Sequence, residues 1–129
     1  MAGIPDSNYF FDTYALVEFY NGSANYEKFL GRKFFTTKLN LLEFYYQLLS
    51  RGLREDAESA FLTFSPNCIF VTDDVLKKAA EFRLAFNSKK RSRTSFIDAI
   101  GYVIARENGL KFVTGDDAFK NVGGVEFVK

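Results

Sequence analysis

Two patterns of apolar residues divide the chain. Short apolar runs, rich in aromatic and β-branched side chains, have the size and composition of strands that are buried on both faces. These runs are residues 9–11, 34–35, 68–71, 111–113 and 125–128. The pattern predicts a strand at each of them.

Longer segments between these runs repeat apolar residues at helical spacing. Leu39, Leu42, Tyr46 and Leu49 form such a repeat, and Gly109 follows the last segment as a favourable residue for a helix end. The predicted helices are residues 13–21, 26–30, 39–51, 53–64, 73–87 and 95–108. Because strands and helices alternate, the pattern predicts an α/β fold with a parallel sheet and helices on both faces. Ligands bind such folds at the carboxyl ends of the strands.

Length and composition predict one domain that spans residues 1–129. Hydrophobic residues make up 47% of the chain, and 16 Phe with 7 Tyr supply bulky side chains for its core. The first residues lack the pattern of a secretory signal, and no apolar stretch approaches the roughly 20 residues that span a bilayer. The lone cysteine, Cys68, cannot form an internal disulfide and fits a reducing compartment. We therefore expect a cytoplasmic protein without a membrane-spanning segment.

Charge and residue usage narrow the chemistry that is open to the chain. The net charge is +1, so any attraction to nucleic acid must come from a local patch. The sequence has no histidine, which excludes histidine metal ligands and every catalytic triad that contains histidine. A single cysteine also excludes a zinc site built from several cysteines. Carboxylates are therefore the expected reactive groups.

Four acidic residues stand where strands and helices meet. Asp12 ends the first predicted strand and Asp116 follows the fourth, while Glu43 and Asp98 lie in the early turns of apolar helices. Four carboxylates that converged in one cleft would repel one another unless a cation neutralised them. Oxygen ligands in that number suit Mg²⁺ or Mn²⁺ better than zinc.

A purely structural role is the alternative for each of these acids. The two acids at strand ends can cap the segments that follow them, because Asp is a favoured N-cap residue. Ser95-x-x-Asp98 resembles a capping box, and Asn40-x-x-Glu43 is a looser version of the same motif. Taken singly, none of the four acids identifies a site.

Four cations, Lys89, Lys90, Arg91 and Arg93, lie just upstream of the helix that carries Asp98. A basic run of this kind is commonly a solvated loop. The functional alternative is an arm that contacts RNA phosphates beside the acidic residues, because a phosphodiester substrate is itself negative.

In order and spacing, the acidic positions and their neighbours resemble the PIN domain over nearly the whole chain. The matching motifs are Asp12-Thr13, Glu43, Phe96-Ile97-Asp98-Ala99 and Thr114-x-Asp116-x-x-Phe119. The resemblance implies a three-layer α/β/α sandwich with a central parallel sheet, and an endoribonuclease that depends on Mg²⁺ or Mn²⁺. In its length, the chain is similar to the toxin ribonucleases of prokaryotic toxin–antitoxin pairs. That similarity implies an RNA substrate, a homodimer and an inhibiting antitoxin protein.

The resemblance also implies a role for each matching residue. Asp12, Asp98 and Asp116 would hold the cation, and Glu43 would orient a ligand water or a second ion. The expected products carry 5′-phosphate and 3′-hydroxyl ends. The residues that would support these carboxylates are Thr13, Thr114 and Asp117.

Two positions depart from the family pattern, and two other functions stay open. Tyr14 stands where a small polar residue is usual, and Ala118 stands where a further acid often lies. The first alternative is a PIN-like module that binds RNA or protein without cleavage. The second is a phosphatase of the haloacid-dehalogenase type, which would need a second acid two residues after Asp12, where Tyr14 stands.

Overall fold

A computed structural model describes residues 8–89 and 93–129 of the chain. Two residues of the predicted basic arm, Lys90 and Arg91, lie outside the described residues. In the described part, strands and helices alternate as the apolar pattern predicts. The strands are β1 (Tyr9–Phe11), β2 (Phe34–Phe35), β3 (Lys111–Thr114) and β4 (Val125–Phe127).

The helices agree closely with the predicted ranges. The α-helices are α1 (Thr13–Tyr20), α2 (Lys38–Ser50), α3 (Arg54–Phe64), α4 (Asp73–Lys89) and α5 (Phe96–Glu107). The short segment predicted at residues 26–30 is a 3₁₀-helix, η1 (Ala24–Phe29), and two shorter 3₁₀ turns are η2 (Ser65–Asn67) and η3 (Asp117–Phe119). Each α-helix begins and ends within two residues of the predicted range, which is the precision expected of element boundaries.

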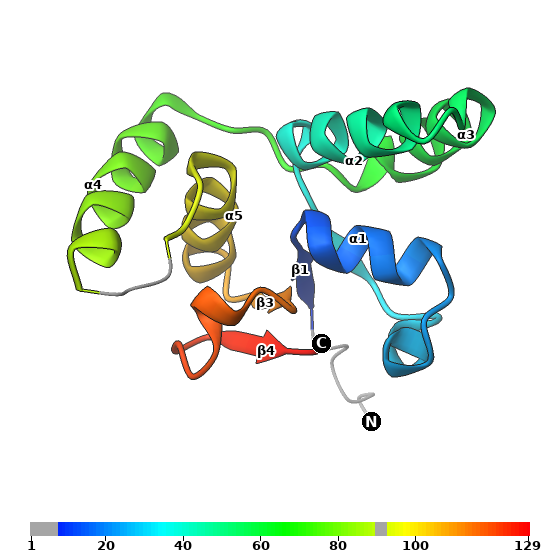
Figure 1. Cartoon of the computed structure of the whole chain (residues 1–129). Coiled ribbons are helices and arrows are strands. Elements are labelled where there is room, and N and C mark those ends of the chain that lie inside the picture. Colours follow the sequence, from blue (N-terminus) through cyan, green and yellow to red (C-terminus); the bar gives the residue numbers. More distant parts are fainter. Residues whose placement is uncertain (1–7, 90–92) are drawn as a thin grey trace.

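The described strands form one four-stranded sheet in the order β2-β1-β3-β4, and every pair is parallel. β1 pairs with β2 on one side and with β3 on the other. Figure 1 shows the helices α1, α2 and α3 on one side of the sheet, with α4 and α5 on the other. The predicted α/β class, with a parallel sheet between two helical layers, is therefore confirmed.

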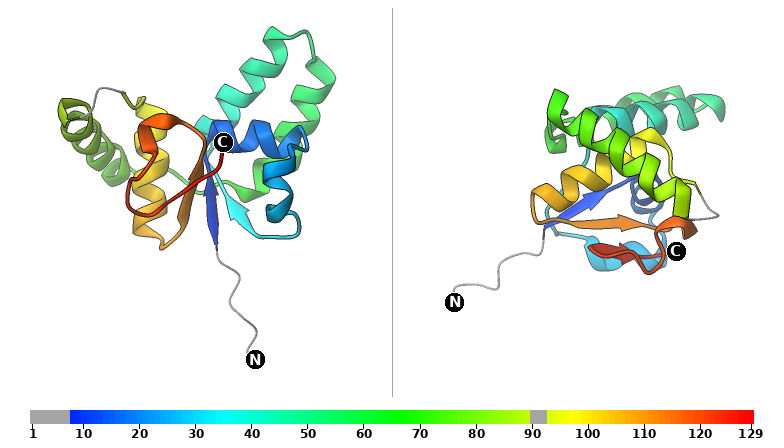
Figure 2. Two further views of the ribbon diagram at one scale, coloured as in Figure 1. Left: turned by 60° about the horizontal axis from the view of Figure 1, so that its bottom comes forward. Right: turned by 90° about the vertical axis from the view of Figure 1, so that its left-hand side faces the viewer.

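Alternation along the strands explains the two helical layers. Phe10 and Phe11 are both fully buried, but successive side chains of a strand point to opposite faces. Phe11 stacks on Phe34 at 4.2 Å between ring centroids and packs with α1, α2 and α3. Phe10 stacks on Phe112 at 5.8 Å and packs with α4 and α5. The left view of Figure 2 shows the sheet between these two layers.

The strand predicted at residues 68–71 is wrong. Only Cys68 forms a bridge, with Thr36 beyond the end of β2, and the bridge is parallel and isolated. Ile69 donates its backbone N–H to Thr36 at 2.8 Å, and Phe70 is 83% exposed. β2 itself pairs over two residues, so the neighbouring segment has almost no ladder to extend. The chain then turns away to start α4.

No helix within residues 8–89 and 93–129 has the length and apolar character needed to cross a membrane.

Candidate functional site

The sheet topology creates an edge where four acidic residues lie together. From β1 the chain runs outward to β2, and it later returns to place β3 on the other side of β1. In a parallel sheet this reversal of strand order opens a crevice at the carboxyl ends of the two central strands. Asp12 directly follows β1, and Asp116 lies two residues after β3. α2 and α5 begin near the same edge and carry Glu43 and Asp98.

A cleft of about 540 Å³ lies at this edge. The four acids singled out in the sequence all line it, and two further carboxylates join them. The six acidic residues are Asp12, Glu18, Glu43, Asp98, Asp116 and Asp117. Among the described residues that line the cleft, Lys129 carries the only positive charge. A cleft with this excess of negative charge attracts cations and repels nucleic acid unless a cation intervenes.

Asp12 caps a helix and also lines the acidic cleft. It is the N-cap of α1, and its carboxylate accepts a hydrogen bond from the backbone N–H of Ala15 at 2.8 Å. Its side chain is 2% exposed and still forms part of the cleft wall. Burial raises the pKa of the Asp12 carboxyl well above its usual range, although hydrogen bonds from Thr114 and Ala15 oppose the shift. The negative charges of Asp98 and Asp116 raise this pKa further.

Asp98 is held in the first turn of α5. The Ser95 hydroxyl accepts a hydrogen bond from the Asp98 backbone N–H at 3.0 Å, which is the capping contact that the Ser95-x-x-Asp98 motif predicts. Burial raises the pKa of the Asp98 carboxyl to about 6, and the charges of Asp116 and Glu43 add to the rise. Two acids from different segments therefore act on Asp98 through space, which places these carboxylates within reach of one another.

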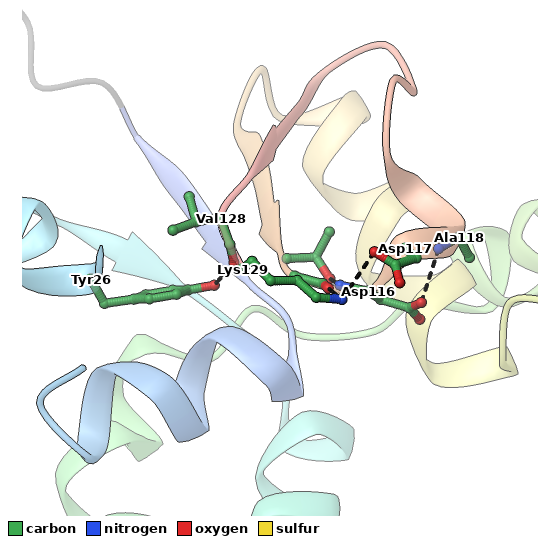
Figure 3. A network of polar contacts seen from close by, with 8 residues as sticks. Tyr26, Asp116, Asp117, Ala118, Val128 and Lys129 are labelled. Carbon is green, nitrogen blue, oxygen red and sulfur yellow. Dashed lines mark hydrogen bonds and ion pairs between the residues drawn. The ribbon is translucent and has the colours of Figure 1, made fainter. Parts of the chain in front are cut away.

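Asp116 caps the short η3 turn, as its structural interpretation predicts. Its carboxylate accepts a hydrogen bond from the Ala118 backbone N–H at 3.0 Å (Figure 3), and its own N–H donates to the Thr114 hydroxyl at 3.0 Å. The Thr114 side chain also hydrogen-bonds the Asp12 carboxyl. One buried hydroxyl, 0% exposed, therefore links the loop after β3 to the acid after β1.

Glu43 is oriented by a chain of buried polar side chains. The Thr13 hydroxyl donates to the Glu43 carboxylate at 2.5 Å, and the Asn40 amide donates to the Thr13 hydroxyl at 3.2 Å. The Thr37 hydroxyl in turn donates to the side-chain amide oxygen of Asn40 at 2.6 Å. The looser capping box that the sequence predicted at Asn40-x-x-Glu43 is wrong: Thr37 is the N-cap of α2 and accepts from the Asn40 N–H. Asn40 lies inside the helix and faces the core.

Replacing Asn40 by alanine is expected to lower the free energy of unfolding by about 1–3 kcal/mol. Asn40 is 0% exposed, so N40A leaves the buried Thr37 O–H without an acceptor and removes the amide N–H that the buried Thr13 hydroxyl accepts. Urea denaturation measures the change. N21A is the matched control, because Asn21 is exposed and only its backbone N–H takes part in the capping of α1, by donating to the carbonyls of Val17 and Phe19. Equal stability of N40A and N21A would contradict the role of Asn40.

A close packing contact shapes the cleft at the position where Tyr14 departs from the family pattern. The Tyr14 ring lies against Gly115, and both residues line the cleft. A methyl group at position 115 would collide with this ring and would stand 2.7 Å from the Val128 carbonyl oxygen. Glycine between β3 and Asp116 therefore accommodates the larger side chain of Tyr14, and the ring becomes part of the wall.

The described residues of the basic run do not line the acidic cleft. Lys89 and Arg93 are both exposed. Arg93 lies with Arg83 at a separate shallow pocket of about 300 Å³ between the end of α4 and the start of α5. The predicted contact of this run with RNA stays a prediction, and for Lys90 and Arg91 it concerns residues outside the described part.

Two charged residues of the site were not singled out from the sequence, and a third residue, Asn40, was considered only as a helix cap. Glu18 and Lys129 line the cleft, and Asn40 orients Thr13 from beneath it. A buried amide inside an apolar helix is a weak signal that could have identified Asn40. For Glu18 and Lys129 the sequence holds no comparable signal, because exposed charged residues of both kinds are frequent along the chain.

The donors of the cleft fit Mg²⁺ or Mn²⁺. They are carboxylate oxygens, which such ions prefer, and burial makes Asp12 and Asp98 costly to ionise without a compensating charge. Within residues 8–89 and 93–129, no three acidic, cysteine or histidine side chains are grouped closely enough to bind one ion. The carboxylates therefore share a cleft while their oxygens remain apart.

Two comparisons with known proteins, by sequence and by structure, match most of the chain. The sequence model of the family described as "PIN domain" matches residues 9–125. Among curated proteins, no sequence matches the chain.

Three solved structures resemble the whole chain. The toxin VapC20 of Mycobacterium tuberculosis, described as cleaving the sarcin–ricin loop, is 21% identical with a TM-score of 0.74; the match covers 93% of this chain and 98% of that one. VapBC2 of Rickettsia felis, bound to a DNA fragment from its promoter, is 17% identical with a TM-score of 0.74 and coverages of 95% and 99%. A toxin–antitoxin complex from Klebsiella pneumoniae is 19% identical with a TM-score of 0.71 and coverages of 92% and 95%. At these identities the likeness concerns the fold.

Proposed function

Because this chain belongs to the PIN-domain family, we propose that it is an endoribonuclease dependent on Mg²⁺ or Mn²⁺. One observation carries the proposal: Asp12, Glu43, Asp98 and Asp116 come from four separate segments and line a single cleft. These are the positions at which the sequence matches the family motifs. Structural roles as helix caps explain the local contacts of three of these acids, but they do not explain why all four share one cleft.

The carboxylates divide into ligands and a positioning group. Asp12, Asp98 and Asp116 would hold the cation, and Glu43 would orient a ligand water or a second ion. When bound, the ion lowers the pKa of a coordinated water and neutralises charge that develops on the scissile phosphate. The protein contributes carboxylate oxygens that line one cleft. The backbone N–H of Ala15 limits the orientation of the Asp12 side chain, and the Thr13 hydroxyl limits that of Glu43.

The hydroxyls of Thr13 and Thr114 would support two of the carboxylates, Glu43 and Asp12, in binding a cation or its ligand water. The Thr13 hydroxyl donates to Glu43, so this carboxylate keeps the other oxygen for a water or an ion. Thr114 hydrogen-bonds the Asp12 carboxyl, which favours the charged form that a cation requires. Asp117 is exposed and pairs with Lys129, so we assign it a supporting role rather than a place among the ligands.

We further propose that the chain acts in the cytoplasm as the toxin of a toxin–antitoxin pair, forms a homodimer and is inhibited by an antitoxin protein. Solved toxin–antitoxin complexes of the same fold, from Klebsiella pneumoniae and Rickettsia felis, support this part of the proposal. Exposed apolar side chains on α2 and α3, Leu42, Tyr46 and Leu62, provide surface that a partner chain could cover.

Incubation with a mixed RNA pool tests the proposed reaction. We expect cleavage in Mn²⁺ or Mg²⁺ and no cleavage in EDTA. The expected products carry 5′-phosphate and 3′-hydroxyl ends, because the attacking water would form the new P–O bond while the bond from phosphorus to the 3′-oxygen breaks, so the 3′-oxygen leaves as a hydroxyl and the phosphate stays on the downstream fragment. Sequencing after ligation to 5′-phosphate ends maps the products. An RNA pool that stays intact in both metals would instead support a module that binds RNA or protein without cleavage.

A further inference from the structure

The segment after β4 is fixed against the body of the protein and delivers one cation to the acidic cleft. The buried Tyr26 hydroxyl donates to the Val128 carbonyl at 2.8 Å, and the Val128 N–H donates to the Thr114 carbonyl at 2.8 Å. The Asn25 amide donates to the Lys129 carbonyl at 3.3 Å. Figure 3 shows Tyr26 on one side of this segment and the Lys129 side chain reaching toward the loop after β3 on the other.

The Lys129 ammonium group has two partners in the cleft. It lies 2.9 Å from a carboxylate oxygen of Asp117 and donates to the Gly115 carbonyl at 3.2 Å. The side chains of Lys129 and Asp117 are 59% and 71% exposed, so water surrounds much of the pair. An exposed ion pair of this kind contributes little to stability, and its partners exchange at small cost.

Lys129 lies in a cleft where RNA phosphates would meet mostly negative charge. Six carboxylates line the cleft, and an RNA strand brings further negative charge to it. One divalent ion offsets only two of these charges. An ammonium group at the cleft wall can form charge-assisted hydrogen bonds with phosphate oxygens, which are stronger than those of neutral donors. The fixed main chain of Val128 and Lys129 keeps this group beside the acids while the flexible side chain can change partners.

We propose that Lys129 is a substrate-contacting residue, which leaves Asp117 and binds a non-bridging phosphate oxygen of the RNA strand in the cleft. In the free protein Asp117 holds the ammonium group, and RNA and Asp117 compete for it. The inference rests on the proposed nuclease function and deepens it by assigning a phosphate contact from outside the set of matching family positions. A lysine that only fastens the end of β4 to the loop at Gly115 is the structural alternative.

The two roles predict different effects of the two partners. If Lys129 contacts phosphate, K129Q weakens RNA binding, whereas D117N frees the ammonium group and strengthens it. If the Lys129–Asp117 pair only fastens the segment after β4, both variants break the same contact, and both change RNA binding in the same direction or not at all. K28Q is the matched control, because the Lys28 side chain is 55% exposed, close to the 59% of Lys129, and it also forms an ion pair, with Glu126; neither Lys28 nor Glu126 lines the cleft.

Fluorescence anisotropy with a labelled single-stranded RNA of mixed sequence, in Mg²⁺ and at several KCl concentrations, tests the inference. The parent protein is D98N, in which cleavage is expected to be absent. Adding K129Q is expected to raise Kd about three- to tenfold and to reduce the slope of log Kd against log salt by about 0.7, because one phosphate contact is lost. Adding D117N is expected to lower Kd, and adding K28Q to change it less than twofold.

Equal effects of K129Q and K28Q would overturn the inference, as would shifts of K129Q and D117N in the same direction. Failure of the D98N parent to bind the RNA would overturn it as well. Melting temperatures of all variants show whether each one is folded. Cleavage of the RNA pool by the unmodified protein decides the proposed function separately, so a nuclease that retains full RNA affinity in K129Q refutes only the role of Lys129.

Discussion

Replacing Asp12 by asparagine is expected to lower RNA cleavage about 100- to 1,000-fold or more while the fold is retained, because an electrostatic contribution to the transition state is lost. Asp12 is the N-cap of α1 and accepts from the Ala15 N–H. Asparagine keeps an oxygen for this hydrogen bond and is an equally good N-cap residue, so α1 should begin at the same place. The negative charge that a cation needs is lost. Initial cleavage rates in Mn²⁺ and the circular dichroism spectrum measure the two effects.

D74N is the control for this variant. Asp74 carries an exposed carboxylate on α4, paired with Lys78 and remote from the residues that line the cleft. Like D12N, the D74N variant removes one negative charge. Its cleavage rate should nevertheless stay within about twofold of that of the unmodified protein, because an exposed ion pair contributes little to stability. Full activity in D12N would show that this carboxylate serves only as a helix cap, and the nuclease assignment would then lose its central residue.

In EDTA, the D98N variant is expected to be more stable than the unmodified protein at pH 7, by up to about 3 kcal/mol. The pKa of Asp98 is about 6 in the folded protein and about 3.9 in an unfolded chain, so the folded state binds the proton more tightly. Raising the pH from 4 to 7 ionises a carboxyl that burial and two neighbouring acids oppose, and the folded state loses stability across this window. Asparagine carries no charge and escapes this loss.

Urea denaturation at pH 4, 5, 6 and 7 measures the difference. The difference in free energy of unfolding between D98N and the unmodified protein should increase as the pH rises from 4 to 7 and then stay constant above pH 7. D74N provides the control for removal of an exposed carboxylate, and its difference from the unmodified protein should change little. Addition of Mn²⁺ at pH 7 should stabilise the unmodified protein more than D98N, because a cation offsets the repulsion that remains. A difference for D98N that decreases with rising pH would contradict the electrostatic description of the cleft.

Patterns within short stretches of sequence were sufficient for most of the fold. Phe10 and Phe11 are adjacent apolar residues, and a strand that needs apolar side chains on both faces must be covered by two layers. The helical repeats on α2 and α5, together with the alternation of strands and helices, then left a parallel α/β arrangement as the expected class. The segment at 68–71 has the same local pattern as a strand. It does not form a strand because its neighbour, β2, pairs over only two residues and offers few backbone groups for further pairing. The length of β2 cannot be read from the segment itself.

The four acidic residues that line the cleft could also be singled out from the sequence. The absence of histidine and the presence of a single cysteine make carboxylates the expected metal ligands, and the order of Asp12, Glu43, Asp98 and Asp116 resembles the PIN pattern. The capping motif at Ser95-x-x-Asp98 was also correct, because it depends on contacts within one helical turn.

The sequence by itself determined the residue types, the elements that carry them and the family to which they belong, since these depend on short-range periodicity and on the order of motifs. Only the tertiary structure decided which side chains meet. The hydrogen-bonded chain Thr37-Asn40-Thr13-Glu43 joins the start of α1 to α2. Lys129 reaches the cleft from a segment that Tyr26 holds through the Val128 carbonyl, just after β4. Such contacts join residues that are far apart in sequence, and the packing of helices on a particular strand order sets their distances.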